Sequence, residues 1–331
     1  MTVSITVIIC SHNPRPAYLE RVLDALKKQS IDYSRWELIL VDNASDISIA
    51  LQWDLSWHPN SRHVLEPAIG LTKARLRGIV EAKAGLLVFL DDDNVPDTDY
   101  LEVVQWLFDR NPDIGVAGAG RLEPIFEEPP PDEITPYFRF LAIRTIEQNV
   151  FKMDTSVSPN PWGAGLCVKA EVAKEYVKQV SVCPIRIGLG RKGDNLISGE
   201  DDEFSWIAQH LGMKHGIFRE LRIQHLIERR RVKANYLERV IRGNGYSCAM
   251  LTCMHGLAGA NPFVAPSLIH MAHLICHLRV KTGIHELRRW ILYWLGAKIN
   301  RRMTTARAQG WECGMADFGK INDSVEKIIS T

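Results

Sequence analysis

The sequence lacks any C-x-x-C pair, although it contains seven cysteines. An odd number of widely spaced cysteines indicates neither a disulfide framework nor a zinc site, and we expect a reducing compartment. The chain also lacks an uncharged apolar run of about 18 residues, so a transmembrane helix is not expected. Its first residues, MTVSITVIICSHN, have no basic segment before the apolar run, so a signal peptide is not expected either.

Glycine and proline are not enriched, with 23 and 16 of 331 residues, so long disordered tracts are not expected. Hydrophobic residues at 46% and charged residues at 24% are typical of a globular chain, here long enough for one large α/β domain plus an appendage, or for two domains. A G-x-G-x-x-G turn is missing after the first apolar run, where the chain reads CSHNPRP. This absence argues against a nicotinamide-dependent oxidoreductase.

Charge is unevenly distributed along the chain, whose formal net charge is +1. Residues 219–302 contain 15 Lys or Arg and 4 Asp or Glu, a balance of +11. The remaining residues contain 25 basic and 35 acidic side chains, a balance of −10. This division predicts two surfaces with different partners, and we expect no nucleic acid among them.

Strands and helices alternate in the first hundred residues. Apolar β-branched runs predict strands at 5–10, 36–46 and 86–90, and helical spacing of leucine and valine predicts helices at 17–29 and 71–85, the latter closed by Gly85. This alternation is typical of a doubly wound, Rossmann-like α/β fold with a mostly parallel sheet flanked by helices.

The later part of the sequence continues this pattern and then becomes helical. We expect a helix at 100–112, a strand at 114–124, a proline-rich surface loop at 126–136, a glycine turn, strand and helix at 160–176, and a helix from Glu200. From about residue 231 the spacing is helical throughout and the segment is basic. The sequence therefore predicts a helical, basic C-terminal extension.

Three carboxylates, Asp91, Asp92 and Asp93, follow the buried strand predicted at 86–90. In open α/β sheets, ligands bind at the carboxyl ends of the strands. Adjacent carboxylates repel each other unless a cation neutralises them, and Mg²⁺ or Mn²⁺ bound there commonly adds substrate phosphates to its coordination shell. A nucleoside diphosphate is therefore indicated, and a solvated acidic turn is the alternative.

Other polar residues are candidates for the same site. Asp42 also follows a predicted strand and suits a base N–H or a ribose hydroxyl, or an Asx-turn. Lys73 and Arg75 suit phosphates or a solvated helix face. The sequence GEDDEF places Glu200 and Asp201 at a helix start, where acids favour the helix dipole but a general base for an acceptor hydroxyl is also suited.

With these residues in place, the chain resembles the family 2 glycosyltransferases, the large inverting family of GT-A fold. The resemblance covers about residues 3–225 and rests on three segments in order. They are ITVIICSHNPRP…LILVDNASD, GLTKARLRGIVEAKAGLLVFLDDDNVPD and WGAG…GEDDEFSWIAQHLG. Two departures stand out: Ser11-His12-Asn13 replaces the family's common Thr-Tyr-Asn, and Leu76 replaces its usual Asn after Arg75.

The resemblance implies a role for each matching residue. Asp42 would read the uracil, Asp91 or Asp92 would contact the ribose, Asp93 would ligate Mn²⁺ or Mg²⁺ as the aspartate of the DxD motif, and Asp201, beside Glu200, would be the base. His225 falls where related enzymes place a histidine near the metal or pyrophosphate, or is an ordinary strand-end histidine. The further candidates are Ser11, His12, Asn13, Asn43 and Arg75 for the nucleotide sugar, Asp91 as a second metal ligand, and Trp162 with Gly163 for the acceptor or sugar.

These inferences define an expected organisation and function. Residues 1–228 would form the catalytic domain, with a nucleotide-sugar half at about 1–120 and an acceptor half at about 121–228, and residues 229–331 would form a membrane-associating helical region. The expected reaction is metal-dependent, inverting transfer from a nucleoside-diphosphate sugar, UDP-linked, to a hydroxyl of a saccharide or lipid-linked acceptor in surface polysaccharide biosynthesis. The alternatives are a sugar nucleotidyltransferase and a non-catalytic membrane-bound partner.

Two segments of the C-terminal region concern metals and membranes. His270, His273 and His277 share one helix face, which we interpret as an amphipathic stripe without zinc. In RRWILYWLGAKINRR, residues 288–302, aromatic residues lie between arginine pairs, a pattern suited to the membrane interface or to docking on the catalytic domain. The expected location is cytoplasmic, peripheral on the inner face of the cytoplasmic membrane.

Overall fold

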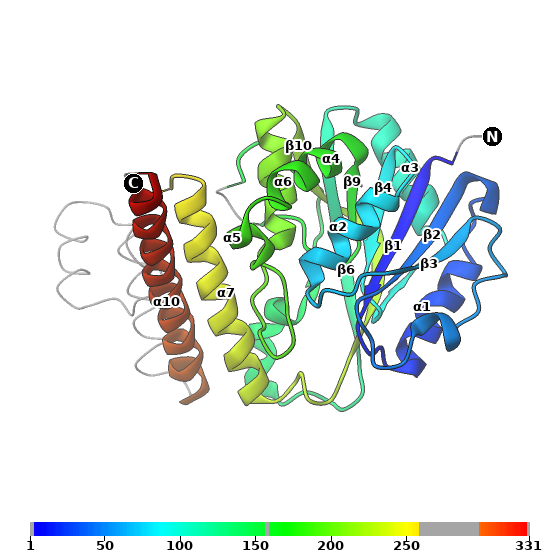
Figure 1. Cartoon of the computed structure of the whole chain (residues 1–331). Helices are drawn as coiled ribbons and strands as arrows, with labels where there is room; N and C mark the ends of the chain where they lie inside the picture. The colour runs from blue at the N-terminus through cyan, green and yellow to red at the C-terminus, as the bar shows by residue number, and fades with distance from the viewer. Residues whose placement is uncertain (1–2, 156–158, 258–297, 330–331) are drawn as a thin grey trace. The chain divides into compact units, whose positions relative to one another are not determined.

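The computed structural model describes residues 3–155, 159–257 and 298–329. Its contacts divide the chain into two units (Figure 1). The first unit comprises 1–129, 141–195 and 199–229, and the second comprises 130–140, 196–198 and 230–331. The two short segments of the second unit have no counterpart in the expected division at residue 228.

The first unit contains the sheet and most of the helices. Its strands are β1 (Ile5–Ser11), β2 (Trp36–Asp42), β3 (Ser61–Leu65), β4 (Leu86–Leu90), β5 (Asn94–Pro96), β6 (Ile114–Phe126), β7 (Arg144–Thr145), β8 (Val150–Lys152), β9 (Leu166–Lys169) and β10 (Lys214–Ile227). Its helices are α1 (Pro16–Lys27), α2 (Leu71–Glu81), α3 (Tyr100–Arg110), α4 (Ala170–Val180), α5 (Pro184–Ile187) and α6 (Glu200–His210), with short 3-10 turns η1 (Tyr33–Arg35) and η2 (Ile49–Leu51).

The strands form one mixed sheet in the order β3-β2-β1-β4-β9-β6-β10-β5, with β7 added to β6 and β8 to β10. Strands β1 to β4 pair in parallel, as the alternation of strands and helices predicted. Strand β9 is antiparallel to both β4 and β6, so it reverses the direction in the middle of the sheet. The mostly parallel α/β fold is confirmed, with this antiparallel insertion.

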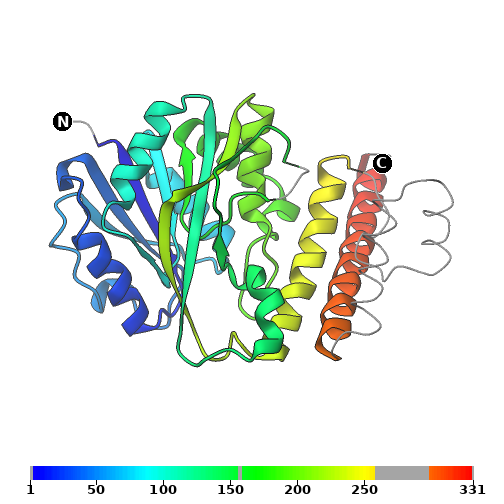
Figure 2. The same cartoon turned by 180° about the vertical axis from the view of Figure 1, so that it is seen from behind.

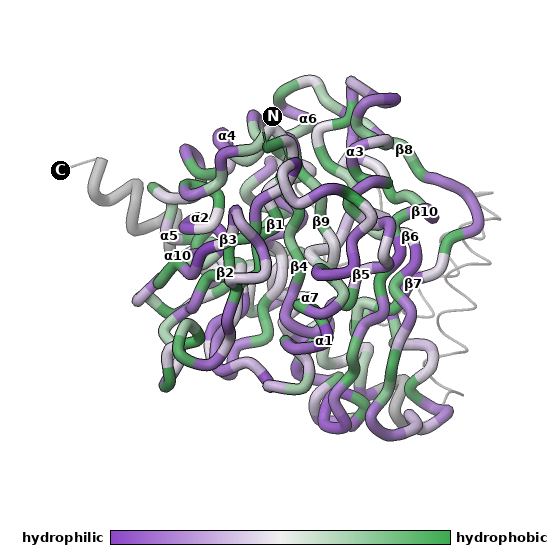
Figure 3. Tube along the Cα trace, turned by 90° about the vertical axis from the view of Figure 1, so that its right-hand side faces the viewer, coloured by the Kyte–Doolittle hydropathy of each residue, from purple (hydrophilic) through white to green (hydrophobic). Residues whose placement is uncertain are grey.

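Helices cover both faces of the sheet, and its central strands are therefore buried. Apolar residues of α1 and α3 pack on one face with Ile5, Val7 and Ile9 of β1. Those of α2, α4 and α6 pack on the other face with Ile8. Figure 1 shows α2, α4 and α6 in front of the sheet, Figure 2 shows α1 and α3 in front, and Figure 3 shows the continuous apolar character of β4.

Two elements differ from the expectation. Helix α2 ends at Glu81 rather than at Gly85, because side chains of neighbouring strands bind the chain that follows it. Lys83 N donates to Glu37 Oε1 at 2.7 Å, and Ala84 N donates to Thr6 Oγ1 at 3.2 Å. The proline-rich loop expected at 126–136 is partly ordered, since a 3-10 helix, η3, spans Asp132–Leu141.

The second unit is built on two long helices, α7 (Ala234–Met254) and α10 (Lys298–Ile329). Their backbones approach closely at glycines, since a Cβ at Gly245 would overlap Arg307 O and one at Gly310 would overlap Arg242 O. No helix in the described ranges is both long and apolar enough to cross a membrane. The histidine stripe at 270–277 and residues 288–297 of the aromatic segment lie outside the described residues.

Candidate active site

The carboxyl ends of β1 and β2 meet as expected, since Ser11 and Asp42 are paired in register. Ser11 Oγ donates to Asp92 Oδ2 in a short hydrogen bond, which joins the end of β1 to the aspartate run after β4. Asn43 N donates to Ser11 O at 2.8 Å, and His12 Nδ1 lies 2.9 Å from Asn43 O. Four of the predicted site residues therefore lie within one hydrogen-bonded strand-end cluster.

Asp42 organises the loop after β2. Its Oδ1 accepts from Ser45 N at 2.9 Å and its Oδ2 accepts from Ile49 N at 3.0 Å, and the residue is 4% exposed. This is the Asx-turn geometry that the sequence left as an alternative. Asp42 as the uracil-reading residue stays a prediction, and any base would bind through lone pairs that the two backbone N–H groups leave unused.

Asn43 anchors the start of α2. Its side-chain amide donates to Glu66 O at 3.1 Å and to Ala68 O at 3.0 Å, and its Oδ1 accepts from Gly70 N at 2.8 Å. Each polar atom of the amide is therefore occupied by backbone. Asn43 thereby holds Gly70, whose φ of 140° favours glycine, at the N-terminus of α2, and its predicted nucleotide-sugar contact stays a prediction.

The aspartate run forms a turn that Asn94 holds together. Asn94 is fully buried, its Oδ1 accepts from Asp91 N at 3.2 Å, and its Nδ2 donates to Asp93 Oδ1 at 2.8 Å. Strand β5 then pairs antiparallel with β10. The three carboxylates are partly exposed at the strand end, so they remain accessible to a ligand.

Arg75 links the aspartate run to the acidic start of α6. Its guanidinium is only 2% exposed, with Nη1 at 3.1 Å from Glu200 Oε1 and Nη2 at 3.6 Å from Asp91 Oδ1. Burial acts to lower the pKa of Arg75, but Glu200, Asp91 and Asp201 outweigh it and raise the pKa. Arg75, predicted to contact the nucleotide sugar, is thus a buried cation between two acidic segments, and such a contact stays a prediction.

Asp93 and His225, both predicted as metal ligands, lie close together, and their role in binding a metal stays a prediction. Asn94 and His225 are partners across β5 and β10, and this places His225 Nε2 3.3 Å from Asp93 Oδ2. His225 Nδ1 lies 3.4 Å from Ala142 O. The predicted third ligand, Asp91, lies beside Arg75 instead, and no group of three or more candidate metal-ligating side chains occurs in the described part of the chain.

The first turn of α6 holds its acids in different environments. Glu200 lies in the ion pair with Arg75, and burial raises its pKa to about 7. Asp202 accepts from Asn160 Nδ2 at 3.2 Å, and burial together with the Asp201 charge raises its pKa to about 8. Asp201 accepts backbone N–H groups at both oxygens, from Gly163 at 2.8 Å and from Asp202 at 3.0 Å.

Residues 160–163 form the wall beside these acids. A Cβ at Gly163 would lie 2.6 Å from Arg75 Nη2, so only glycine fits between Arg75 and Asp201. Trp162 packs partly on the core, and the Arg144 guanidinium covers its ring at 3.4 Å from the centroid. One face of the ring is therefore already occupied, and the predicted sugar stacking on Trp162 would use the other.

Asn13 completes the strand-end cluster. Its backbone is left-handed, with φ of 50°, which asparagine tolerates better than most residues. Its N–H donates to Ser45 Oγ at 2.9 Å, and its side chain exchanges two hydrogen bonds with Asp46. The loops after β1 and β2 therefore support each other, and the nucleotide contact predicted for Asn13 stays a prediction.

Sequence reasoning missed Asn94, Arg144 and Asn160. Asn94 was visible in the run DDDN, as the polar residue that closes the turn. Arg144 and Asn160 carry no local signal, because β7 has only two residues and their contacts span the fold.

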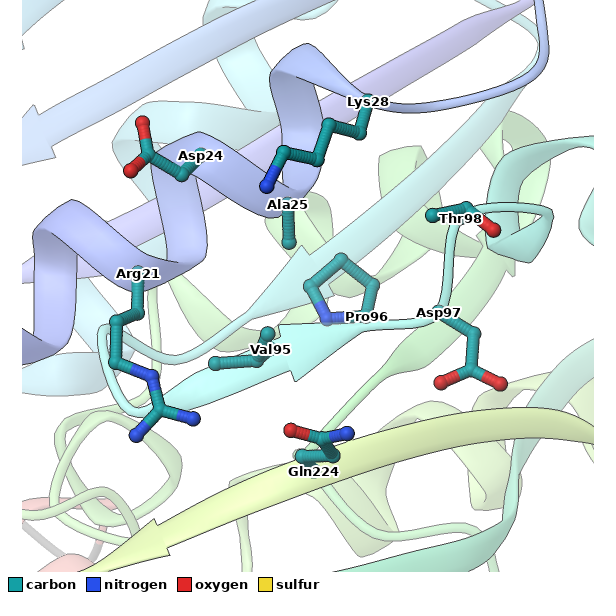
Figure 4. A pocket seen from close by; sticks show the side chains of 9 residues that line it. All are labelled: Arg21, Asp24, Ala25, Lys28, Val95, Pro96, Asp97, Thr98 and Gln224. Carbon is teal, nitrogen blue, oxygen red and sulfur yellow. The ribbon is translucent and has the colours of Figure 1, made fainter.

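A separate groove of about 510 Å³ lies between α1 and the strands β5 and β10 (Figure 4). It is lined by Val95, Pro96 and Gln224, with Arg21 and Lys28 among the charged residues on its rim. Neighbouring side chains in a strand point to opposite faces, so Gln224 faces this groove and His225 faces the strand-end site. The groove shares no lining residue with the strand-end cluster.

The sheet, its covering helices and the acidic strand ends are the features of a GT-A fold. Residues 6–158 match the family model described as Glycosyl transferase family 2. The match confirms, over these residues, the resemblance inferred from the sequence.

Two further comparisons concern a curated relative and the fold. The chain is 31% identical over 113 residues to Uncharacterized protein y4gI of Sinorhizobium fredii, covering 33% of this chain and 12% of that protein's length. Solved structures of S. aureus TarS residues 1–349, alone and with UDP-GlcNAc, share 12% and 13% identity, each with a TM-score of 0.50 over 96% of this chain and 92% of theirs. At this identity, the structural likeness confirms the fold alone.

Proposed function

We propose that this glycosyltransferase is metal-dependent and inverting, and that it transfers a sugar from a UDP-sugar to a hydroxyl of a saccharide or lipid-linked acceptor. One observation carries the proposal: Arg75 joins the aspartate run after β4 to the acidic start of α6 within one site. A donor diphosphate at the strand ends would thereby lie beside a carboxylate suited to deprotonate an acceptor. The S. aureus TarS complexes with UDP and UDP-GlcNAc support a UDP-linked donor on the same fold.

Asp93 and His225 fit a divalent cation. One carboxylate and one imidazole, 3.3 Å apart, leave most coordination positions to water and phosphate oxygens, as is usual for Mg²⁺ and Mn²⁺ at nucleotide sites. A cation held there would neutralise the charge that develops on the departing diphosphate. Asp91 would act on the site through its ion pair with Arg75. The Asp92 carboxylate is already oriented by its hydrogen bond from Ser11.

Asp201 is the proposed general base. Four acids lie in the first turn of α6. Glu200 is engaged by Arg75, Glu203 is paired with Arg186 at 2.8 Å, and the pKa of Asp202, raised to about 8, favours its neutral form at pH 7. Asp201 is held from the backbone at both oxygens, which fixes its orientation. It would accept the acceptor proton while the hydroxyl oxygen attacks the anomeric carbon opposite the leaving UDP, and a single displacement of this kind inverts the anomeric configuration.

A membrane-linked acceptor belongs to the same proposal. The balance of +11 over residues 219–302 suits an anionic membrane surface. We therefore propose peripheral association with the inner face of the cytoplasmic membrane and an acceptor in surface polysaccharide assembly.

The test is a panel of sugar nucleotides incubated with the full chain, with and without Mn²⁺, while UDP and pyrophosphate are measured separately. The proposal predicts Mn²⁺-dependent release of UDP from one UDP-sugar, accelerated by a hydroxyl acceptor. Pyrophosphate release from a sugar phosphate and UTP would identify a sugar nucleotidyltransferase instead. Binding of sugar nucleotides without turnover on any acceptor would indicate the non-catalytic alternative.

A further inference from the structure

Arg144, the first residue of β7, is a buried arginine with an incomplete set of partners. The residue is 8% exposed. Its guanidinium stacks on the Trp162 ring at 3.4 Å, and its Nη2 donates to Asn160 O at 2.9 Å. Its Nη1 is buried and has no hydrogen-bond acceptor among the described residues.

The two contacts of Arg144 hold the two ends of one short segment. Asn160 donates its side-chain amide to Asp202 Oδ1 at 3.2 Å, and Gly163, next to Trp162, donates its backbone N–H to Asp201 Oδ2 at 2.8 Å. Both residues that Arg144 touches are therefore connected, directly or through a neighbour, to the acids of α6. A change at Arg144 would be transmitted to Asp201 and Asp202 along this segment.

A purely structural role does not account for a charged side chain here. A buried N–H without an acceptor is destabilising, whereas an apolar side chain could cover Trp162 without that penalty. Burial lowers the pKa of Arg144 to about 10, and the charges of Asp201 and Asp202 act against this lowering. The guanidinium charge thus interacts with both carboxylates, although its hydrogen bond goes to Asn160.

We propose that Arg144 is a positioning residue of the transfer reaction: it fixes residues 160–163 against Asp201 and compensates the negative charge of the first turn of α6. The assignment rests on the proposed function of Asp201 as the base. The other charged or titratable groups around this turn are Arg75 and its partner Asp91, Tyr176 on α4, Arg191, Arg186 and its partner Glu203, and Glu200 itself.

The experiment compares Arg144→Met and Arg144→Gln, which remove the charge, with Arg144→Lys, which keeps it. The titration of Asp202 is followed by carbon NMR of carboxyl-labelled aspartate in the full chain, with Asp202→Asn for assignment. Both neutral variants should move the Asp202 midpoint upward by about one pH unit, since removing a nearby cation disfavours the carboxylate. Arg144→Lys should stay within about 0.3 pH unit of the parent protein.

Activity gives the second readout. In the neutral variants the kcat of transfer should fall about tenfold or more, while UDP affinity stays within about twofold, because Arg144 acts on the base rather than on the donor. Arg62→Met is the control, since it removes a guanidinium that pairs with Glu37 at 2.7 Å elsewhere in the same unit. It should leave the Asp202 midpoint and kcat unchanged.

Folding of each variant is checked by circular dichroism. One folded neutral variant, Arg144→Met or Arg144→Gln, is enough to decide the test. An unmoved Asp202 midpoint in a folded neutral variant would overturn the assignment of Arg144, even if activity were lost. The titration requires no substrate, so it is independent of the transfer assay. A parent protein that shows no sugar transfer would contradict the proposed function, and this failure is thereby distinguished from a failure of the role of Arg144.

Discussion

At the scale of single residues, the first three of the four acids that begin α6 differ in their partners rather than in their chemistry. Glu200 is paired with a buried arginine, Asp202 with a side-chain amide, and Asp201 with backbone N–H groups. The sequence GEDDEF indicated a base somewhere in this run, but it could not separate its members because their partners come from α2 and residues 160–163. The separation is a property of the tertiary structure.

The first prediction concerns the identity of the base. Asp201→Asn should retain UDP affinity within about twofold and lose transfer by about a hundredfold or more, because an amide cannot accept the acceptor proton at neutral pH. Glu200→Gln is the comparison, measured by steady-state transfer and by UDP calorimetry. Transfer that persists in Asp201→Asn but fails in Glu200→Gln would assign the base to Glu200.

The second prediction concerns pH. The pKa of an aspartate in the unfolded chain is about 3.9. Folding raises the pKa of Asp202 to about 8, so the folded state binds the extra proton between these two values. Stability attributable to Asp202 is therefore fully present below the unfolded pKa and is lost as pH rises toward 8, by at most about 1.4 kcal/mol per pH unit. Thermal unfolding of the parent protein should show this fall between about pH 5 and pH 8.

Asp202→Asn should flatten that part of the stability profile, because asparagine keeps an acceptor for Asn160 but carries no titratable group. Glu171→Gln, at an exposed acid in the first turn of α4, serves as the control and should leave the slope unchanged. An equal slope in Asp202→Asn and the parent protein would contradict the assignment of the proton to Asp202.

At the scale of elements, the strands and helices of the first hundred residues were predictable because their signals are local. Apolar runs specify β1, β2 and β4, and helical spacing specifies α1 and α2. The end of α2 was not predictable, since it depends on Glu37 and Thr6 of other strands. The antiparallel β9 and the meeting of Asp93 with His225 likewise depend on pairings between distant segments.

The third prediction concerns the packing of α7 on α10. Gly310→Ala should destabilise the second unit by about 1–3 kcal/mol, because the new methyl group would overlap Arg242 O of α7. Gly319→Ala is the matched control on the same helix, since a Cβ there meets no described atom within 4 Å. It should be neutral or stabilising by up to about 1 kcal/mol in denaturant unfolding. Equal effects of the two substitutions would contradict the close approach of the helices.

At the scale of the whole molecule, the separation of charge along the chain is the basis for the proposed membrane association. The segment 219–302 carries the excess of positive charge, and the remaining residues carry the excess of negative charge. A basic surface is attracted to anionic lipid over about one Debye length, so the attraction weakens as salt is added.

The fourth prediction is that the full chain sediments with anionic liposomes at low salt and is released as salt rises. Joint substitution Trp290→Ala and Trp294→Ala, in a segment outside the described residues, should weaken binding by removing aromatic anchors. Neutral liposomes are the control, and unchanged circular dichroism shows that the variant is folded. Equal recovery in the supernatant with and without anionic liposomes would favour a soluble acceptor.

The account as a whole depends on a donor diphosphate bound at the strand ends through Asp93, and calorimetric titration of UDP tests this most directly. The parent protein should bind UDP about tenfold or more tightly with Mn²⁺ than without it, and Asp93→Ala should lose that difference. Asp24→Ala, on the partly exposed face of α1, should retain it. Mn²⁺-dependent UDP binding that is unchanged in Asp93→Ala would contradict the account.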